Sequence, residues 1–403
     1  MFPLLPRLSP PRFLACAPPL LLAWAPLLGC SLDVTPLAGR PLPGATAGPT
    51  DAGGLDAGRL DAGAGGPDAG APIADRTYLV AAGDLRLVLL DLSDPSAPIE
   101  LSALDPRDAD DEEPLPLYSL SVNERGHIFA GRYGAIEAYG IEGETLADLA
   151  TIRIGSGHAL SVQAAGTRLY AALGEEGVRI FDVSDLQAAR VVGQIPAQRS
   201  IHDVALIDAD HLSFYDGDDS ALFVYDVRDP AAPVLTFSWI TDFVGSRSSG
   251  MAASGGFVAV NATYQNGGSG LWFWIVRDLN APASLGFHPD VRAPRGGGVA
   301  LWPMGESVFG YFTDSEIGVV IAEATTNRVH PRSGLLPGTA FDALIHERVL
   351  YVAEGDNGVA VYALNEERPE APERTRTVTP LARGTYRLAR VQVERGDRED
   401  SAP

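Results

Sequence analysis

The sequence contains no lysine, and all 30 of its basic residues are arginine. They are outnumbered by 52 acidic residues, which gives a formal net charge of −22 at pH 7. Such an acidic protein repels the phosphates of nucleic acids and of anionic lipid head groups. We therefore expect no nucleic-acid partner, and we attribute the absence of lysine to a GC-rich genome rather than to function.

Cysteine is scarce as well, because Cys16 and Cys30 are the only two and both lie in the N-terminal region. The rest of the chain can therefore hold neither an internal disulfide nor a thiolate metal site. A P-loop, a Gly-x-Ser-x-Gly nucleophile elbow and a dinucleotide-binding fingerprint are also missing. The sequence thus predicts no catalytic residue, no cofactor and no metal, and it favours a protein that is not an enzyme.

Residues 1–29 have the pattern of a secretion signal. Arg7 and Arg12 precede an apolar run over residues 13–29, which is the order of the basic and apolar regions in a signal peptide. The alternative is a membrane-spanning helix, but the run has the minimum length for spanning and contains three prolines. We predict that residues 1–29 are a signal peptide.

The segment Leu27-Leu28-Gly29-Cys30 ends this run and resembles the lipobox of bacterial lipoproteins. The resemblance implies cleavage before Cys30 and lipidation of that cysteine, which would anchor the protein stably to a membrane. By the same resemblance, Ser31 after the cysteine permits delivery to the outer membrane. We therefore expect a bacterial cell-envelope lipoprotein, periplasmic or surface-exposed, with the membrane as a partner through the lipid on Cys30.

A low-complexity segment follows over residues 30–75. It repeats Asp-Ala-Gly at Asp51, Asp56, Asp61 and Asp68 and has no apolar periodicity, so it can bury no core. Calcium binding is the alternative for repeated aspartates, but the Ala-Gly spacing lacks the alternating oxygen ligands of a calcium loop. We predict a disordered tether that spans roughly 35–40 Å as a flexible coil.

From residue 76 onward, short apolar runs alternate with Gly/Asp turns and predict an all-β domain. The segment Gly177–Asp185 (GVRIFDVSD) is one of seven copies of a repeat, whose first positions are Arg86, Gly134, Gly177, Ala221, Gly270, Gly318 and Gly358. Their spacing of 40 to 49 residues is typical of propeller blades. The sequence therefore predicts a seven-bladed β-propeller of four-stranded antiparallel blades over residues 76–395, with a disordered tail over residues 396–403.

The third repeat shows how a blade divides into strands. From inside to outside, we expect strands over His158–Ala164, Arg168–Ala172, Gly177–Val183 and Arg190–Ile195. The first repeat has no inner strand before it, and an open propeller would leave two unpaired sheet edges. We predict that Tyr386–Glu394 supplies the missing strand and closes the ring; the alternative is a frayed outer strand followed by a tail.

The repeat resembles the LVIVD-repeat family of β-propellers. The resemblance rests on residues 87–95 (LVLLDLSDP), 178–185 (VRIFDVSD) and 222–230 (LFVYDVRDP), and it covers residues 77–365. It implies a cell-envelope propeller of largely undefined biochemistry, because the motif specifies a blade and not an activity.

The inner strands of a propeller surround its central channel, and ligands often bind at the face where these strands begin. The aligned first positions are Ser119, Ser161, Asp203, Gly250, Gly298 and Asp342, with His158 and His202 beside them. We predict six candidate ligand-binding residues, namely Ser119, His158, Ser161, His202, Asp203 and Asp342. The alternative is that small and acidic residues only satisfy crowded strand starts.

Two further patterns have structural explanations. Acidic hairpins recur at one position of different repeats, namely residues 174–176, 216–219, 314–316 and 354–357, so we interpret them as solvated turns rather than calcium loops. We expect the aromatic run Leu271–Trp274 to pack between blades; the alternative is that one of its faces contacts a sugar or a protein.

The function that fits the sequence best is a lipid-anchored, non-catalytic binding or scaffold module for a protein or a glycan, monomeric and held on its tether. The alternative is a metal-assisted hydrolase at the channel mouth, built from His158, His202, Asp203 and Asp342. Convergence of these side chains within metal-ligand distance would favour the enzyme.

Overall fold

The computed structural model describes residues 76–83, 86–105, 117–197, 200–216, 221–240, 246–264, 269–288, 297–379, 384 and 386–393. All of them belong to one unit, Asp68–Pro403. The predicted signal peptide (1–29), tether (30–75) and tail (396–403) lie outside the described residues. Within the described ranges, no helix is long and apolar enough to cross a membrane.

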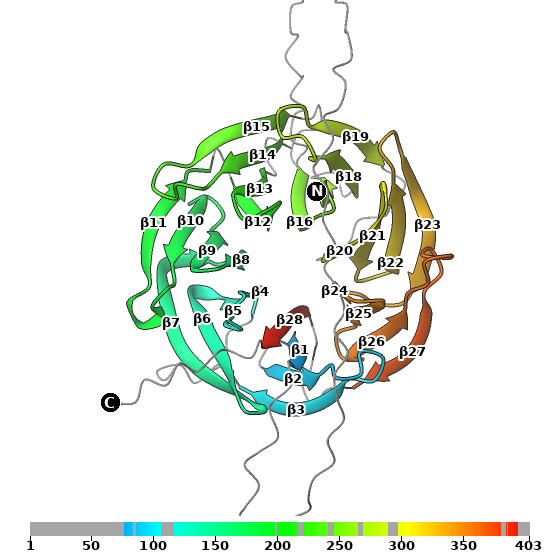
Figure 1. Ribbon diagram of the computed structural model, residues 1–403, viewed down its shortest axis with the longest axis horizontal. Helices are drawn as coiled ribbons and strands as arrows, with labels where there is room; N and C mark the ends of the chain where they lie inside the picture. The colour runs from blue at the N-terminus through cyan, green and yellow to red at the C-terminus, as the bar shows by residue number, and fades with distance from the viewer. Residues whose placement is uncertain are drawn as a thin grey trace, which may run out of the picture. The chain divides into compact units, whose positions relative to one another are not determined.

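The described residues form seven four-stranded antiparallel sheets, arranged as the blades of a ring (Figure 1). From the inner to the outer strand, blade 1 contains β28 (Arg387–Val393), β1 (Arg76–Ala82), β2 (Leu87–Asp91) and β3 (Ile99–Leu104). Blade 2 contains β4 (Ser119–Val122), β5 (Ile128–Gly131), β6 (Tyr133–Glu142) and β7 (Thr145–His158). Blade 3 contains β8 (Ser161–Ala165), β9 (Arg168–Ala172), β10 (Val178–Asp182) and β11 (Arg190–Ile195). Blade 4 contains β12 (Ile201–Leu206), β13 (His211–Asp216), β14 (Ala221–Asp226) and β15 (Val234–Ile240). Blade 5 contains β16 (Ser246–Ser254), β17 (Phe257–Tyr264), β18 (Ser269–Ile275) and β19 (Ala283–His288). Blade 6 contains β20 (Val299–Met304), β21 (Ser307–Asp314), β22 (Gly318–Ala324) and β23 (Val329–Pro337). Blade 7 contains β24 (Asp342–His346), β25 (Val349–Ala353), β26 (Val359–Ala363) and β27 (Glu373–Val378). The seven-bladed, all-β prediction is confirmed.

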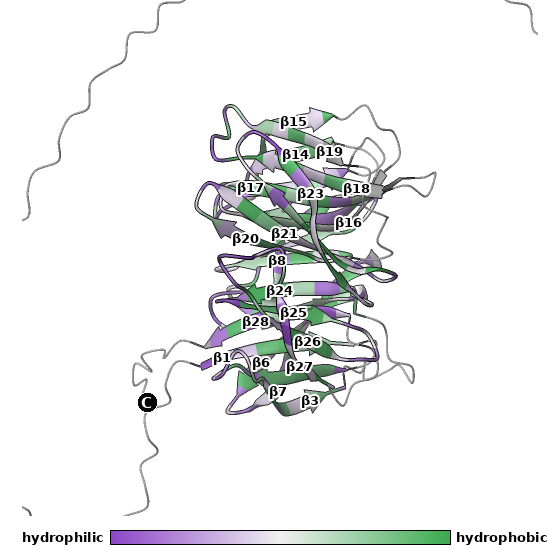
Figure 2. Cartoon of the chain, turned by 90° about the vertical axis from the view of Figure 1, so that its right-hand side faces the viewer, coloured by the Kyte–Doolittle hydropathy of each residue, from purple (hydrophilic) through white to green (hydrophobic). Residues whose placement is uncertain are grey.

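Each blade buries both faces against its neighbours, and the aromatic run of β18 illustrates how. Successive side chains of a strand point to opposite faces. Trp274 therefore faces blade 4, with its ring 6.4 Å from that of Tyr215, while Phe273 faces blade 6, with its ring 5.5 Å from that of Phe312. Trp272 is buried as well. Packing of Leu271–Trp274 between blades is thus confirmed, and Figure 2 shows hydrophobic residues concentrated in the strands.

The ring is closed by a strand from the C-terminal region, as predicted. In Figure 1 the red β28 lies beside the blue β1, and the two strands pair with Tyr78 opposite Val391. Val391 is fully buried and belongs to a cluster with Tyr78 and Val80 between blades 1 and 2. Blade 1 therefore combines strands from the beginning and the end of the propeller sequence.

The aspartates of the repeat hold the turn after the third strand. Asp91 Oδ1 accepts a hydrogen bond from Ser93 N at 2.8 Å in blade 1. In blade 3, Asp185 Oδ1 accepts one from Gln187 N at 3.0 Å and so caps the 3₁₀ turn Leu186–Ala188. Short acceptor side chains at these positions satisfy backbone donors that the strand ladder leaves free. The repeated aspartates thus serve the architecture.

The boundary between blades 2 and 3 differs from the prediction. His158 is the last residue of β7, where it lies opposite Tyr133, and does not begin the inner strand of blade 3. That inner strand starts at Ser161. The reason is that β6 has ten residues, so its partner β7 stays paired as far as His158 and leaves two residues to connect the blades.

Candidate functional site

The inner strands place one residue each at an equivalent position near their first end. We call this set the axial ring, and in order around the blades it contains Arg387, Ser119, Ser161, Asp203, Gly250, Gly298 and Asp342. Six of these residues are paired with a residue of the second strand of their blade, and neighbouring inner strands contact one another around the ring. The seventh, Gly298, directly precedes β20 and accepts a hydrogen bond from the second-strand residue Thr313 through its carbonyl oxygen. The structure therefore brings four of the six predicted candidates to one end of the inner strands.

Asp342 fastens blade 7 to blade 1. Its Oδ2 accepts a hydrogen bond from Leu388 N at 3.0 Å, and its Oδ1 accepts one from Ala343 N at 2.9 Å. Gly298 in blade 6 leaves room for this carboxylate, because an added Cβ there would lie 1.7 Å from Asp342 Oδ1. Burial raises the pKa of Asp342, while the positive charge of Arg387 and the two backbone donors act in the opposite direction. Both oxygens thus accept backbone hydrogen bonds, and the bond to Oδ2 joins blade 7 to blade 1.

Asp203 couples blade 4 to blade 3. Its Oδ1 accepts hydrogen bonds from Ser161 Oγ at 2.6 Å and from Val204 N at 2.9 Å. Burial raises the pKa of Asp203 to about 6, although these hydrogen bonds and the charge of Arg387 oppose the rise. The carboxyl group therefore changes its protonation state close to neutral pH, which is the range that a general acid or base requires.

Arg387 supplies the positive charge of the axial ring. Its Nε donates to Tyr118 O at 2.5 Å and its Nη1 to Phe341 O at 3.4 Å, so the guanidinium connects blade 1 to both neighbouring blades. Arg387 is not among the predicted candidates. Aligning the closing strand Tyr386–Glu394 with the other six inner strands identifies it as the seventh ring position.

His158 lies outside the axial ring, in an aromatic group with Tyr118 and Tyr133. The His158 ring is 4.9 Å from that of Tyr133 and 5.1 Å from that of Tyr118, in edge-to-face contacts. Tyr118 directly precedes Ser119 of the axial ring, and Tyr133 is 46% exposed. The group therefore offers aromatic surface to solvent next to the ring.

The two remaining candidates have separate surroundings. His202 sits at a register shift between Ile201 and Asp203 in β12, and its Nε2 lies 3.0 Å from Ser200 Oγ. Ser119 Oγ is buried and has no hydrogen-bond partner among the described residues. In the part of the chain that the structure describes, no group of three or more His, Cys, Asp or Glu side chains is placed to hold a metal ion.

Three acidic residues of the hairpins, Asp216, Asp314 and Glu354, are buried, which makes the interpretation as solvated turns wrong at these positions. Asp314 is 1% exposed, and its Oδ1 accepts a hydrogen bond from Ile317 N at 3.0 Å. Glu354 is 6% exposed and pairs with Arg374 on β27 at 2.7 Å. The reason is that the first hairpin residue still pairs with the third strand and so faces protein rather than water. Residues 217–219 of the hairpin in blade 4 lie outside the described residues.

The described residues define a seven-bladed β-propeller whose inner strands carry a polar ring at one end. The model of the LVIVD repeat family matches residues 77–105, which overlap the first three strands of the chain in blade 1. The chain is therefore a β-propeller that carries the LVIVD repeat. No curated relative matches it.

Several solved structures share the fold at low sequence identity. A protein from Lactobacillus plantarum is 12% identical with a TM-score of 0.57, over 80% of this chain and 100% of its own. A candidate 6-phosphogluconolactonase from Bacteroides uniformis is 15% identical with a TM-score of 0.59, over 79% of this chain and 99% of its own. A second, from Bacteroides fragilis, is 14% identical with a TM-score of 0.60, over 80% and 100%. At such identities the likeness concerns the fold alone.

Proposed function

We propose that this protein is a lipid-anchored propeller of the bacterial cell envelope that binds a protein or a glycan and acts without catalysis. The leader, Cys30 and the Asp-Ala-Gly tether support this proposal, because together they would hold the domain within roughly 35–40 Å of a membrane, most simply as a monomer on the outer membrane. A propeller suits recognition, since loops at its ends can vary while the blades keep their geometry.

The aromatic group of Tyr118, Tyr133 and His158 carries the proposal. It is exposed beside an axial ring whose charged members Asp342 and Arg387 already bond to neighbouring blades. Aromatic side chains contribute a large contact area at a small entropic cost, and they are enriched where partners bind most strongly. The ligand is therefore expected to contact the face on which Tyr133 lies.

Photo-crosslinking in cells that produce the protein tests this face. The variant Tyr133→p-benzoylphenylalanine in the full chain is expected to form a discrete covalent adduct with a protein or a glycan. Leu335 on the outer strand β23 is the matched control, because it is 53% exposed and lies away from the axial ring. Equal adducts at both positions, or none at position 133, would overturn the proposal that the ligand binds at this face.

A hydrolase acting at the axial ring is the second candidate, and the raised pKa of Asp203 favours it. Of the four residues predicted for such an enzyme, Asp203 and Asp342 are in the ring, whereas His158 belongs to the aromatic group. Hydrolysis of an ester or lactone that is lost in Asp203→Asn, while the adduct at position 133 persists, would support this candidate.

A further inference from the structure

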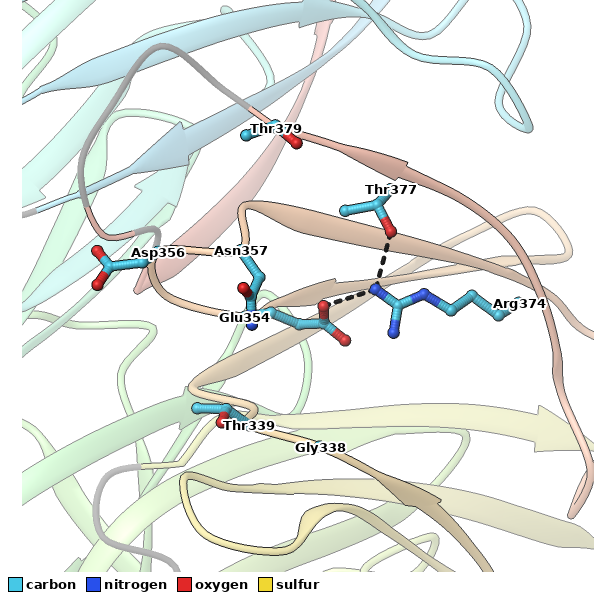
Figure 3. Close-up of a pocket in the computed structure, with 8 residues that line it drawn as sticks. All are labelled: Gly338, Thr339, Glu354, Asp356, Asn357, Arg374, Thr377 and Thr379. Carbon is cyan, nitrogen blue, oxygen red and sulfur yellow. Dashed lines mark hydrogen bonds and ion pairs between the residues drawn. The ribbon is translucent and has the colours of Figure 1, made fainter.

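A pocket of about 420 Å³ lies at one end of blade 7 (Figure 3). Three segments line it: the connection from blade 6 at Gly338 and Thr339, the hairpin at residues 354–357, and the outer strand β27. The hairpin follows Ala353, which pairs with Asp342 of the axial ring. The pocket therefore opens at the end of the blades where the axial ring lies.

The carboxylate of Glu354 is the central feature of this pocket. Its side chain is 6% exposed, and its Oε2 accepts a hydrogen bond from Arg374 Nη2 at 2.7 Å. No described residue donates a hydrogen bond to its Oε1, which lies 4.0 Å from the position of an added Cβ at Gly338. Glu354 lines the pocket, so Oε1 is available to accept a hydrogen bond from water or from a ligand that enters the pocket.

Arg374 presents donors to the same space. Its Nη2 also donates to Thr377 Oγ1 at 2.8 Å, so one nitrogen makes both of these hydrogen bonds. The guanidinium lies over the ring of Tyr362, 5.7 Å from its centre, which fixes its plane. In Figure 3 the other terminal nitrogen of Arg374 and the second oxygen of Glu354 point in the same direction, toward Gly338. The pocket thus places a donor next to an acceptor.

The charges around the pocket limit the class of ligand. Glu354 and Arg374 neutralise each other, and Asp356 adds a negative charge, which disfavours phosphate and other anions. A metal ion would lie beside a guanidinium, and the described residues provide no group of three ligands for it. A neutral ligand with several adjacent hydroxyl groups can donate to Glu354 Oε1 and also accept from Arg374 and from threonine hydroxyls.

A second pocket, of about 630 Å³ at the opposite end of blade 7, lacks this feature. It also holds an ion pair, between Arg348 and Glu366 at 2.6 Å, but their side chains are 69% and 55% exposed. Water already solvates both groups, and exposed pairs of this kind contribute little. This pocket therefore provides a control for the loss of a glutamate charge in the same blade.

We propose that the pocket at Glu354 binds a neutral sugar residue. This inference rests on the proposed binding function and specifies its ligand as a glycan. Glu354 accepts hydrogen bonds from sugar hydroxyls, Arg374 donates to them, and the hydroxyl groups of Thr339 and Thr377 complete the polar lining.

The test is calorimetric titration of the full chain with glucose, galactose, mannose and N-acetylglucosamine. At least one sugar is expected to bind saturably, and Glu354→Gln is expected to weaken that binding about 10-fold, since a charged acceptor is lost. Glu366→Gln should bind like the unaltered protein. Thr339→Val, which removes a pocket hydroxyl without changing size, should also weaken binding and serves if Glu354→Gln unfolds.

The proposal is overturned if none of the four sugars binds, if both pocket variants leave binding unchanged, or if inorganic phosphate or calcium ions displace the sugar. The same measurements test the proposed binding function separately from the pocket. If the adduct at position 133 persists in Glu354→Gln and the unaltered protein binds no sugar, the proposed binding function is retained and this pocket is not its site. Sugar binding that requires Glu354, with no adduct at position 133, would retain the pocket and remove the aromatic group as the ligand face.

Discussion

At the scale of single residues, the ionised form of Asp203 destabilises the folded domain. Its pKa rises from 3.8 to about 6 because the folded protein removes water from the carboxylate. The folded state therefore holds the proton more tightly than the unfolded state, and the corresponding stability is complete below pH 3.8 and is lost as the pH rises through about 6. A shift of this size corresponds to at most about 3 kcal/mol.

Replacing this carboxyl group should therefore stabilise the protein at high pH. Asp203→Asn keeps an oxygen that can accept from Ser161 and Val204, and removes the charge. We expect the free energy of unfolding at pH 8 to increase by up to about 3 kcal/mol, with the gain vanishing toward pH 4. Urea unfolding of both proteins between pH 4 and pH 8 measures the difference.

Asp226 provides a control of opposite sign. Hydrogen bonds from Arg228 lower the pKa of Asp226 to about 2, so its contribution to stability is present at neutral pH and is lost as the pH falls through about 2. Asp226→Asn should accordingly be less stable than the unaltered protein at pH 8. A loss of stability in Asp203→Asn at the same pH would contradict the argument for Asp203.

The residues of the candidate site were predictable where the repeat fixes them. Ser161, Asp203 and Asp342 share one position in a periodic ladder, so alignment of the repeats places them together. Glu354 was not predictable in this way, because composition indicates a solvated acidic turn and only the packing of β27 over the hairpin buries it. Arg387 required the closing strand to be aligned with the others.

At the scale of strands, periodicity predicts positions better than ends. Arg168–Ala172 and Arg190–Ile195 have the predicted bounds. Gly166 and Gly174 flank the first strand, and the second lies between the Asp185 turn and Pro196. The end of β7 at His158 depends on the length of its partner β6, which the sequence of β7 alone does not contain. Pairing between strands therefore determines the strand ends that local sequence patterns do not predict.

The closing strand β28 should be essential for stability. Val391 is fully buried between blades 1 and 2, whereas the next residue, Gln392, is exposed. We expect Val391→Asp to lower the free energy of unfolding by about 3 kcal/mol or more, because it buries an unpaired charge, and Gln392→Asp to change it little. Urea unfolding of the two variants is the measurement, and equal stabilities would show that β28 does not close the ring.

At the scale of the whole molecule, architecture and chemistry reside in different parts. Apolar clusters between successive blades hold the ring together, and the repeated aspartates hold its turns. The axial ring, the aromatic group and the Glu354 pocket use positions at which the blades differ, all at one end of the strands. Residues at these positions can therefore differ without altering the fold.

The net charge of −22 also bears on how this molecule would be attached to a membrane. A surface with that charge is repelled by anionic lipids, so adsorption of the propeller cannot replace a covalent anchor. Several acyl chains on Cys30, at roughly 0.8 kcal/mol per buried CH₂, would supply the attachment. Attachment should consequently depend on the cysteine and not on salt.

Metabolic labelling with an alkyne analogue of palmitate tests this anchor. The unaltered protein and Cys16→Ser are expected to incorporate the label and to remain in the membrane fraction at high salt, because Cys16 has little apolar sequence before it and so lies outside the predicted lipobox. Cys30→Ser should lose the label completely. Label that persists in Cys30→Ser, or that disappears in Cys16→Ser, would place the lipid elsewhere and would remove the tether as the element that sets the distance between the propeller and the membrane.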